Sequence, residues 1–94
     1  MATIQANVPV IYLREGDTFL VYTPALDLCA HGDSLEDAKK SFETSVELFF
    51  EEVVKHNTVN QVFREYGWKE KKRKWMPPII IGQHSQPVEI PVSA

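Results

Sequence analysis

The sequence has one cysteine and no long apolar run, and each scarcity excludes a class of protein. Cys29 has no second thiol with which to form an intrachain disulfide or a cysteine-rich zinc site. No stretch reaches the roughly 18 apolar residues that a membrane span needs. The first residues also lack the basic and then apolar pattern of a secretion signal. These absences predict a cytoplasmic protein that does not associate with membranes.

The residues that are present are those of an ordinary globular protein. Of 94 residues, 44% are hydrophobic and 24% are charged, a composition that favours a packed core over disorder. A chain of this length can bury one modest core, because small domains leave much of their surface in water. We therefore predict a single domain that spans residues 1–94.

Charge is distributed unevenly along a chain whose formal net charge is −3. Between Glu15 and Glu52 there are ten carboxylates and two lysines, whereas between Arg64 and Lys74 there are six basic residues and two glutamates. This asymmetry indicates an acidic surface suited to a basic partner, with a local basic patch beside it.

Apolar patterning predicts an α+β fold built on an antiparallel sheet. Residues 4–14 and 18–22 are rich in β-branched and aromatic types and flank a turn sequence, which predicts a hairpin. Residues 26–30 alternate as a half-buried third strand does. Ser34, followed three residues later by Asp37, resembles a capping box, and apolar residues then recur every three or four positions to about residue 56. We expect this long helix to cover one face of the sheet.

The second half of the chain predicts smaller elements around the core, which we place at about residues 4–56. A short second helix is expected at about 58–67, ending at Gly67. Residues 68–75 predict a strand with a turn at its lysines, and residues 88–92 predict an edge strand interrupted by prolines. The expected order is β-β-β-α-(α)-β, with the C-terminal strands within about 68–92. The last strand either completes this chain's own sheet or adds to that of a second copy or a partner, so we expect a homo-oligomer.

The run FLVYTPALDLCAHGDSLEDA, residues 19–38, carries a resemblance to a known family. An aromatic-rich strand ends in Tyr22-Thr-Pro24, a third strand closes on Gly32-Asp-Ser34, and an acidic helix start is followed by Ala38. This pattern resembles the signature of the HicB antitoxins of type II toxin-antitoxin systems.

The resemblance implies a partial RNase H-like fold and a protein partner. That partner is a small basic toxin of the HicA type, with a double-stranded-RNA-binding-domain fold, which cleaves messenger RNA. HicB-like antitoxins neutralise the toxin by occluding its active site. Many also carry a C-terminal DNA-binding module, but the residues after 56 are too few for one of the usual size. We therefore expect a short form without an obvious DNA-binding domain.

The titratable residues give little support for catalysis. A nuclease of RNase H-like fold would need converging carboxylates to hold divalent metals, and Asp17, Asp27, Asp33 and Glu47 are the candidates. Asp17 lies in a hairpin turn and Asp33 precedes a helix cap, so each has a local structural role. The three histidines lie on different elements, and no serine stands in a nucleophile motif. We expect a protein that is not an enzyme and that binds no metal or cofactor.

Two surfaces are candidates for binding a partner. The first comprises exposed sheet aromatics and the acidic side of the helix: Tyr12, Tyr22, Asp33, Glu36, Glu43 and Glu47. The second is a basic patch, Lys69, Lys71, Lys72, Arg73 and Lys74, flanked by Trp68 and Trp75. As an alternative to the antitoxin function, this patch could bind DNA or RNA through phosphate contacts and base stacking. The two tryptophans could equally anchor the segment to the core.

Overall fold

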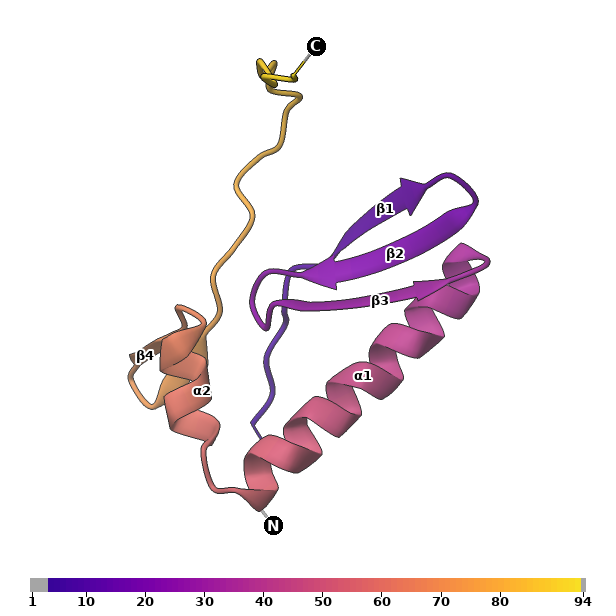
Figure 1. Ribbon diagram of the computed structural model, residues 1–94. Helices are drawn as coiled ribbons and strands as arrows, with labels where there is room; N and C mark the ends of the chain where they lie inside the picture. Colours follow the sequence, from indigo (N-terminus) through magenta and orange to yellow (C-terminus); the bar gives the residue numbers. More distant parts are fainter. Residues whose placement is uncertain (1–3, 94) are drawn as a thin grey trace.

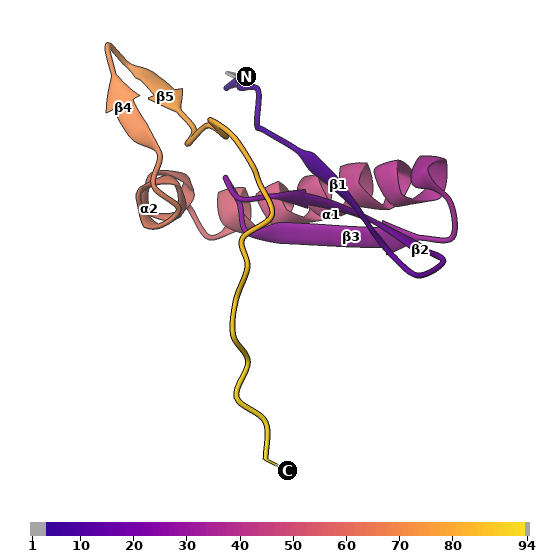
Figure 2. The same ribbon diagram turned by 90° about the horizontal axis from the view of Figure 1, so that it is seen from above.

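The computed structural model describes residues 4–93 and confirms the α+β class (Figure 1). Its elements in chain order are β1 (Ile11–Glu15), β2 (Thr18–Thr23), β3 (Leu28–Gly32), α1 (Leu35–Lys55), α2 (Val59–Glu65), β4 (Lys69–Lys71) and β5 (Lys74–Met76). Strands β1, β2 and β3 form an antiparallel sheet in that order, and β4 pairs with β5 in a separate hairpin. Helix α1 runs along one face of the larger sheet, as expected (Figure 2).

The β1–β2 hairpin is closed by a two-residue loop. Glu15 pairs with Thr18, and Gly16 between them has a φ of +60°. A positive φ at the first loop position is the geometry of a type II′ turn, which a glycine adopts without steric strain and which matches the twist of the strands. The predicted hairpin is thus confirmed, although its first strand begins at Ile11 rather than near residue 4. Pro9 cannot donate a ladder hydrogen bond, and residues 4–10 have no strand pairing.

The third strand begins two residues later than predicted because the chain makes a buried turn after β2. Thr23 is completely buried, and its hydroxyl oxygen accepts a hydrogen bond from the Ala25 amide at 3.2 Å. Ala25 and Leu26 are also buried within this turn, and Asp27 leaves it with a φ of +48°. The apolar alternation that predicted a strand from Leu26 therefore reflects burial in a turn.

Strand β3 and helix α1 approach each other closely at the start of the helix. The Ser34 hydroxyl accepts a hydrogen bond from the Asp37 amide at 3.1 Å, which confirms the predicted N-cap. A Cβ atom on Gly32 would lie 2.6 Å from the Ala38 backbone nitrogen. Beyond this contact, the buried residues of the sheet and helix form one core cluster, Val21, Ala30, Ala38 and Phe42.

A second core cluster joins the turn after β2 to the C-terminal half of the chain. Its buried members are Ala25, Leu26, Phe63, Trp68 and Trp75. The rings of Phe63 and Trp68 stack with centroids 4.2 Å apart. The Trp68 indole Nε1 donates a hydrogen bond to the Ala25 carbonyl oxygen at 2.7 Å, between residues 43 apart in sequence. This cluster places α2 and the β4–β5 hairpin against the end of the sheet.

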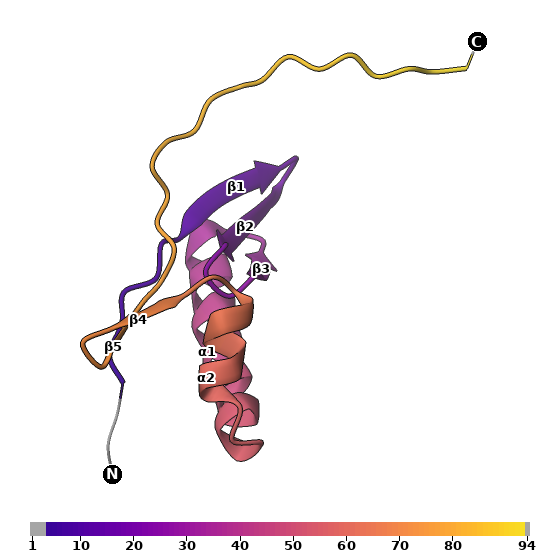
Figure 3. The same ribbon diagram turned by 90° about the vertical axis from the view of Figure 1, so that its left-hand side faces the viewer.

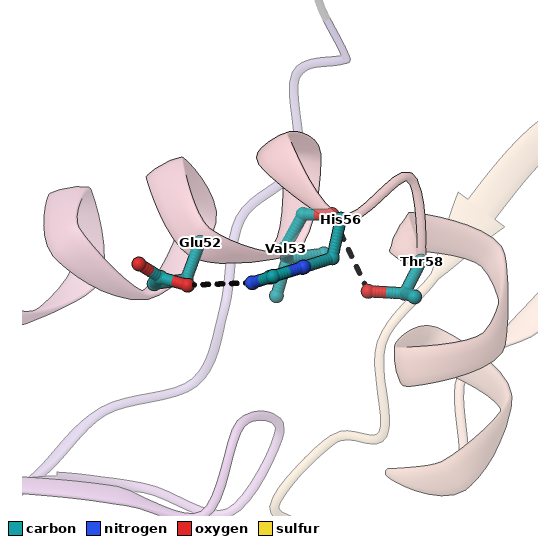
Figure 4. A network of polar contacts seen from close by, with 4 residues as sticks. All are labelled: Glu52, Val53, His56 and Thr58. Carbon is teal, nitrogen blue, oxygen red and sulfur yellow. Dashed lines mark hydrogen bonds and ion pairs between the residues drawn. The ribbon is translucent and has the colours of Figure 1, made fainter.

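Helix α1 ends in a short polar network that turns the chain towards α2 (Figure 4). His56 Nε2 lies 3.0 Å from a Glu52 carboxylate oxygen, and the Thr58 hydroxyl donates to the Val53 carbonyl oxygen at 3.3 Å. Asn57 adopts a left-handed φ of +55°, which asparagine tolerates better than most residues. Helix α2 then begins at Val59, within the predicted range.

Residues 77–93 have no helix or strand, so the prediction that residues 88–92 complete this chain's own sheet is wrong. This segment, hereafter the tail, extends away from the body of the protein (Figure 3). Pro87 and Pro91 have no amide hydrogen to donate, and no strand of the same chain lies alongside to pair with the remaining amides. Among residues 4–93, no helix is long and apolar enough to cross a membrane.

The hydrogen bond from Trp68 can be tested by comparing two tryptophan substitutions in one cluster. Trp68→Phe leaves the buried Ala25 carbonyl without its donor, which costs about 1–3 kcal/mol beyond the loss of ring contacts. Trp75→Phe makes the same side-chain change where no indole hydrogen bond is formed within the described chain. Urea unfolding should therefore show a lower free energy of unfolding for Trp68→Phe than for Trp75→Phe. Equal losses would show that the hydrogen bond adds nothing to ring packing.

The close approach at Gly32 predicts a second difference in stability. Gly32→Ala forces a Cβ against the backbone of Asp37 and Ala38 and should lower the free energy of unfolding by about 1–3 kcal/mol. Gly82→Ala is the control, since no atom lies within 4 Å of the Cβ it would add. Thermal and urea unfolding of both variants measure the effect. An unchanged Gly32→Ala variant would show that the junction between β3 and α1 relaxes freely.

Candidate partner-binding surface

One side of α1 presents a row of carboxylates to solvent. Glu36, Glu43, Glu47 and Glu51 are exposed, and their spacing of seven and four residues places them on the same side of the helix. We call these four residues the acidic face. Lys40 lies among them, and Asp33 is exposed just before the N-cap. Within the described residues, the α1 carboxylate that forms an ion pair is Glu52, which lies outside the acidic face. The acidic face is therefore available to an external cation.

An apolar groove of about 570 Å³ lies next to the acidic face. The N-terminal segment, the turn after β2, α1 and α2 all contribute to its lining: Ile4, Ala6, Val8, Leu26, Val46, Phe50, Val54, Val59, Phe63 and Trp68. A shallower hollow beside it shares Phe50 and Val54 and adds Glu47, Glu51 and Lys55. The groove and the acidic face therefore meet along α1. A segment that enters the groove with apolar side chains would bring its flanking residues to Glu47 and Glu51.

The two sheet tyrosines of the predicted surface lie on opposite faces of the sheet. Tyr12 pairs with Val21, whose side chain is buried under α1. Tyr22 pairs with Ile11, the next pair along the strands, so both of these side chains point to the opposite face of the sheet. Tyr12 lies beside α1, where the Lys39 ammonium is 5.3 Å from its ring centroid. The structure thus places Tyr12 on the same side as the acidic face and separates Tyr22 from it.

Tyr22 belongs to the face of the sheet that α1 leaves uncovered. Strand alternation places Ile11, Leu13, Leu20, Tyr22, Cys29 and His31 on this open face. The Tyr22 hydroxyl donates a hydrogen bond to Asp27 Oδ1 at 3.0 Å. That hydrogen bond raises the pKa of Tyr22, with partial burial and the nearby negative charge acting in the same direction. Tyr22 is therefore a local structural contact of the turn after β2.

The basic segment forms the β4–β5 hairpin. Lys69, Lys71, Lys72, Arg73 and Lys74 are all exposed on it, and the turn residues Lys72 and Arg73 both have positive φ, as in a type I′ turn. Trp68 and Trp75 are only 3% and 9% exposed, and both pack on Phe63. The interpretation of these tryptophans as anchors is confirmed. The hairpin can offer positive charge to phosphate, but these two rings are not exposed for base stacking.

The carboxylates considered for a metal site lie apart in the structure. Asp17 is in the β1–β2 loop, Asp27 contacts Tyr22, and Glu47 lies on the acidic face. Across residues 4–93, no group of three or more histidine, cysteine, aspartate or glutamate side chains is arranged to hold a metal ion. His31 lies on β3, His56 ends α1 and His84 contacts Gln86 in the tail, so the histidines do not gather either.

Sequence reasoning selected Glu36, Glu43 and Glu47 of the acidic face but missed Glu51 and the groove. Phe50 and Val54 were the available signal, because they lie at the edge of or outside the apolar stripe that packs on the sheet. The other walls come from segments distant in sequence, and no local pattern shows that they meet.

No family model matches the chain, and comparison with curated proteins and with solved structures gives no match. The resemblance to HicB antitoxins therefore depends on residues 19–38, and the RNase H-like fold remains a prediction. The candidate surface has to be interpreted from its own geometry.

The contact between Tyr22 and Asp27 predicts an abnormal tyrosine titration. We expect Tyr22 to ionise above its ordinary pKa of 10.0, because its hydroxyl donates to the Asp27 carboxylate. The contact stabilises the fold below that ordinary pKa, and this contribution is lost as pH rises through the higher pKa of the folded protein. Ultraviolet absorbance titration of the phenolates measures the effect. Asp27→Asn suits the left-handed backbone there and should lower the pKa of Tyr22; identical titration curves would contradict the assignment.

Proposed function

We propose that this protein is a non-catalytic binding protein that captures a small basic protein with its acidic face and apolar groove. One observation carries the proposal: exposed carboxylates that form no ion pair within residues 4–93 border an apolar groove on the same helix. Joined to the resemblance at residues 19–38, this surface favours an antitoxin that binds a small basic mRNA-cleaving toxin of the HicA type. The acidic face and the apolar groove contribute to binding in different ways.

The acidic face supplies attraction at long range. Surface carboxylates contribute little to the stability of their own fold, since water and salt screen them. A row of like charges nevertheless raises the local concentration of an oppositely charged partner and speeds its association. Glu43, Glu47 and Glu51 form the most uniformly acidic part of the row, and it lies nearest the groove. Long-range attraction therefore guides the partner towards the groove.

The groove supplies most of the affinity once contact is made. Interfaces draw their binding energy mainly from a few apolar or aromatic anchors buried in pockets, surrounded by a polar rim. Phe50, Phe63 and Trp68 give the groove aromatic walls, and Glu47 and Glu51 give it an acidic rim. The expected ligand is a segment with one or two apolar side chains flanked by lysine or arginine.

Neutralisation of a ribonuclease follows from competition for positive charge. A protein that binds RNA neutralises phosphates with lysine and arginine side chains. A carboxylate row that pairs with the same side chains excludes the RNA, even if it does not reach the catalytic atoms. Occlusion therefore requires no catalytic residue in this chain.

Binding of nucleic acid by the β4–β5 hairpin is less well supported. Five exposed basic side chains favour phosphate contacts, but the burial of Trp68 and Trp75 removes the stacking platform expected from the sequence. Phosphate contacts alone give weak, salt-sensitive and sequence-independent binding. We therefore keep the protein-binding function as the single proposal.

Charge reversal at Glu43 and Glu47 should weaken capture of the small basic protein encoded next to this chain. We expect the double variant Glu43→Lys with Glu47→Lys to lose about tenfold or more in affinity, equivalent to about 1.4 kcal/mol per factor of ten. Its binding should also depend less on salt, because attractive charge pairs have been removed. Titration calorimetry at two salt concentrations, with rescue of growth during co-expression, measures both effects.

The matched control compares single substitutions, Glu47→Lys and Glu52→Lys. Both change the net charge equally, but Glu52 points away from the groove and pairs with His56. Only Glu47→Lys should reduce binding substantially. An equal loss of affinity in both variants would show that only the net charge of the protein matters, and not the position of the acidic face. A neighbouring protein that is neither bound nor toxic would overturn the proposed function.

A further inference from the structure

The tail leaves a set of aliphatic side chains in water. Val88, Ile90 and Val92 are 71%, 75% and 83% exposed, and Ile79 and Ile81 are similarly uncovered. The radius of gyration is 16.4 Å, above the value of about 12 Å expected for a compact chain of this length. Soluble proteins rarely leave such a sequence unpacked without a binding role. The alternation of apolar residues at 88, 90 and 92 is that of a strand with one apolar face.

The prolines restrict such a strand to pairing on one side. In a strand, the amides of successive residues point alternately to opposite edges. Pro87 and Pro91 share an edge with Glu89, whereas the amides of Val88, Ile90 and Val92 all point to the other edge. Residues 88–92 therefore have one edge with a complete set of amide donors and one edge that cannot continue a sheet. Pairing through the complete edge ends the sheet and avoids open-ended assembly.

Strand β1 offers the better of the two free edges of the sheet. On the open face it presents Ile11 and Leu13, and on the helix side it presents Arg14. Strand β3, the other edge, presents Cys29 and His31 on the open face and is followed by Asp33. A strand with aliphatic residues on one face and Glu89 on the other is complementary to β1 on both faces. Against β3 it would gain no aliphatic neighbours on the open face and would approach an acidic residue.

The alternating directions of the amides along β1 decide whether the added strand runs parallel or antiparallel to it. Glu15 and Thr18 close a two-residue hairpin and bond to each other, so the amides of Tyr12 and Arg14 point away from β2. In a parallel pair, each residue that directs its amide inward lies opposite a residue that directs its amide away. Parallel pairing thus allows Ile90 to lie beside Leu13, which places Glu89 opposite Tyr12 and diagonal to Arg14, within reach of its side chain. Antiparallel pairing would put the aliphatic residues on the helix side.

We propose that residues 88–92 of one copy add as a parallel strand to β1 of a second copy, and that reciprocal exchange of tails forms a dimer. The tail is long enough to reach its own β1, because about 11 residues of linker extend over about 36 Å. In the structure it instead diverges from its own sheet (Figure 3). Because β1 offers the complementary edge, the partner is a second copy of this chain, held by backbone pairing, aliphatic contacts on the open face and the pair Arg14–Glu89. The proposed pairing uses the outer edge of β1 and none of the four carboxylates of the acidic face.

Proline substitution at two adjacent positions tests the pairing edge. Ile90→Pro removes an amide that donates to β1, whereas Glu89→Pro removes one that points outward. Sedimentation equilibrium of the full chain should give twice the monomer mass for the unaltered protein. Glu89→Pro loses the contact with Arg14 and should weaken the dimer, but much less than Ile90→Pro does. Ile90→Pro should raise the dimer dissociation constant at least tenfold. A monomeric unaltered protein at about 100 μM, or equal behaviour of the two variants, would overturn the proposal.

A charge swap distinguishes exchange between chains from docking of the tail on its own chain. Arg14→Glu and Glu89→Arg each bring like charges together in a homodimer and should each weaken dimerisation. Mixed in equal amounts, the two variants form a heterodimer in which both exchanged tails meet an opposite charge. Recovery of dimer in the mixture supports the proposal. Failure of the mixture to recover, with dimerisation restored only in the double variant, would contradict exchange through this pair.

These experiments leave the proposed function independently testable. A dimer can form whether or not the acidic face binds a toxin, and the toxin experiment changes Glu43 and Glu47 on α1, which take no part in the proposed strand pairing. Loss of toxin binding with an intact dimer, or the reverse, assigns each failure to its own surface.

Discussion

The hydrogen bond from the Trp68 indole to the Ala25 carbonyl joins the two halves of the molecule. Ala25 lies in the turn that leaves the sheet, and Trp68 lies between α2 and the β4–β5 hairpin. Apart from aromatic packing around Phe63, little else holds the C-terminal elements against the end of the sheet. Because Leu26, Phe63 and Trp68 also line the groove, the same interaction gives the candidate binding surface its shape.

Elements defined by local chemistry were predictable from the sequence. The Ser34 cap and the apolar spacing after it gave a helix at about 34–56, close to the observed Leu35–Lys55. Residues 68–75 predicted a strand with a turn at its lysines, and the structure forms a hairpin there that is anchored through the two buried tryptophan rings. In such segments, local preference and long-range packing favour the same conformation, so pattern alone was sufficient.

The errors arose where tertiary packing decided between equal local patterns. Leu26 alternates with Leu28 as in a strand, but a buried turn uses Leu26 in the second core cluster. The tail alternates as well, yet within its own chain it finds no partner strand. Tyr12 and Tyr22 lie on different strands, so only the pairing register shows that they are on opposite faces of the sheet. The groove forms where the N-terminal segment, the turn after β2, α1 and α2 meet, and no local sequence pattern reveals this arrangement.

The two core clusters share one long helix, α1, and this division predicts which part of the protein unfolds locally first. The sheet cluster includes Ala38 and Phe42 from the first half of α1, whereas Phe49 and Phe50 in its second half pack against the aromatic cluster. Native proteins exchange amide hydrogens through partial openings that follow such cooperative units. Helix α2 and the β4–β5 hairpin have fewer strand hydrogen bonds than the three-stranded sheet. We therefore expect them to detach from the second core cluster while the sheet stays folded. A ligand in the groove binds only when α2 and the hairpin are docked, so its binding would slow amide exchange in α2 and β4–β5 more than in the sheet.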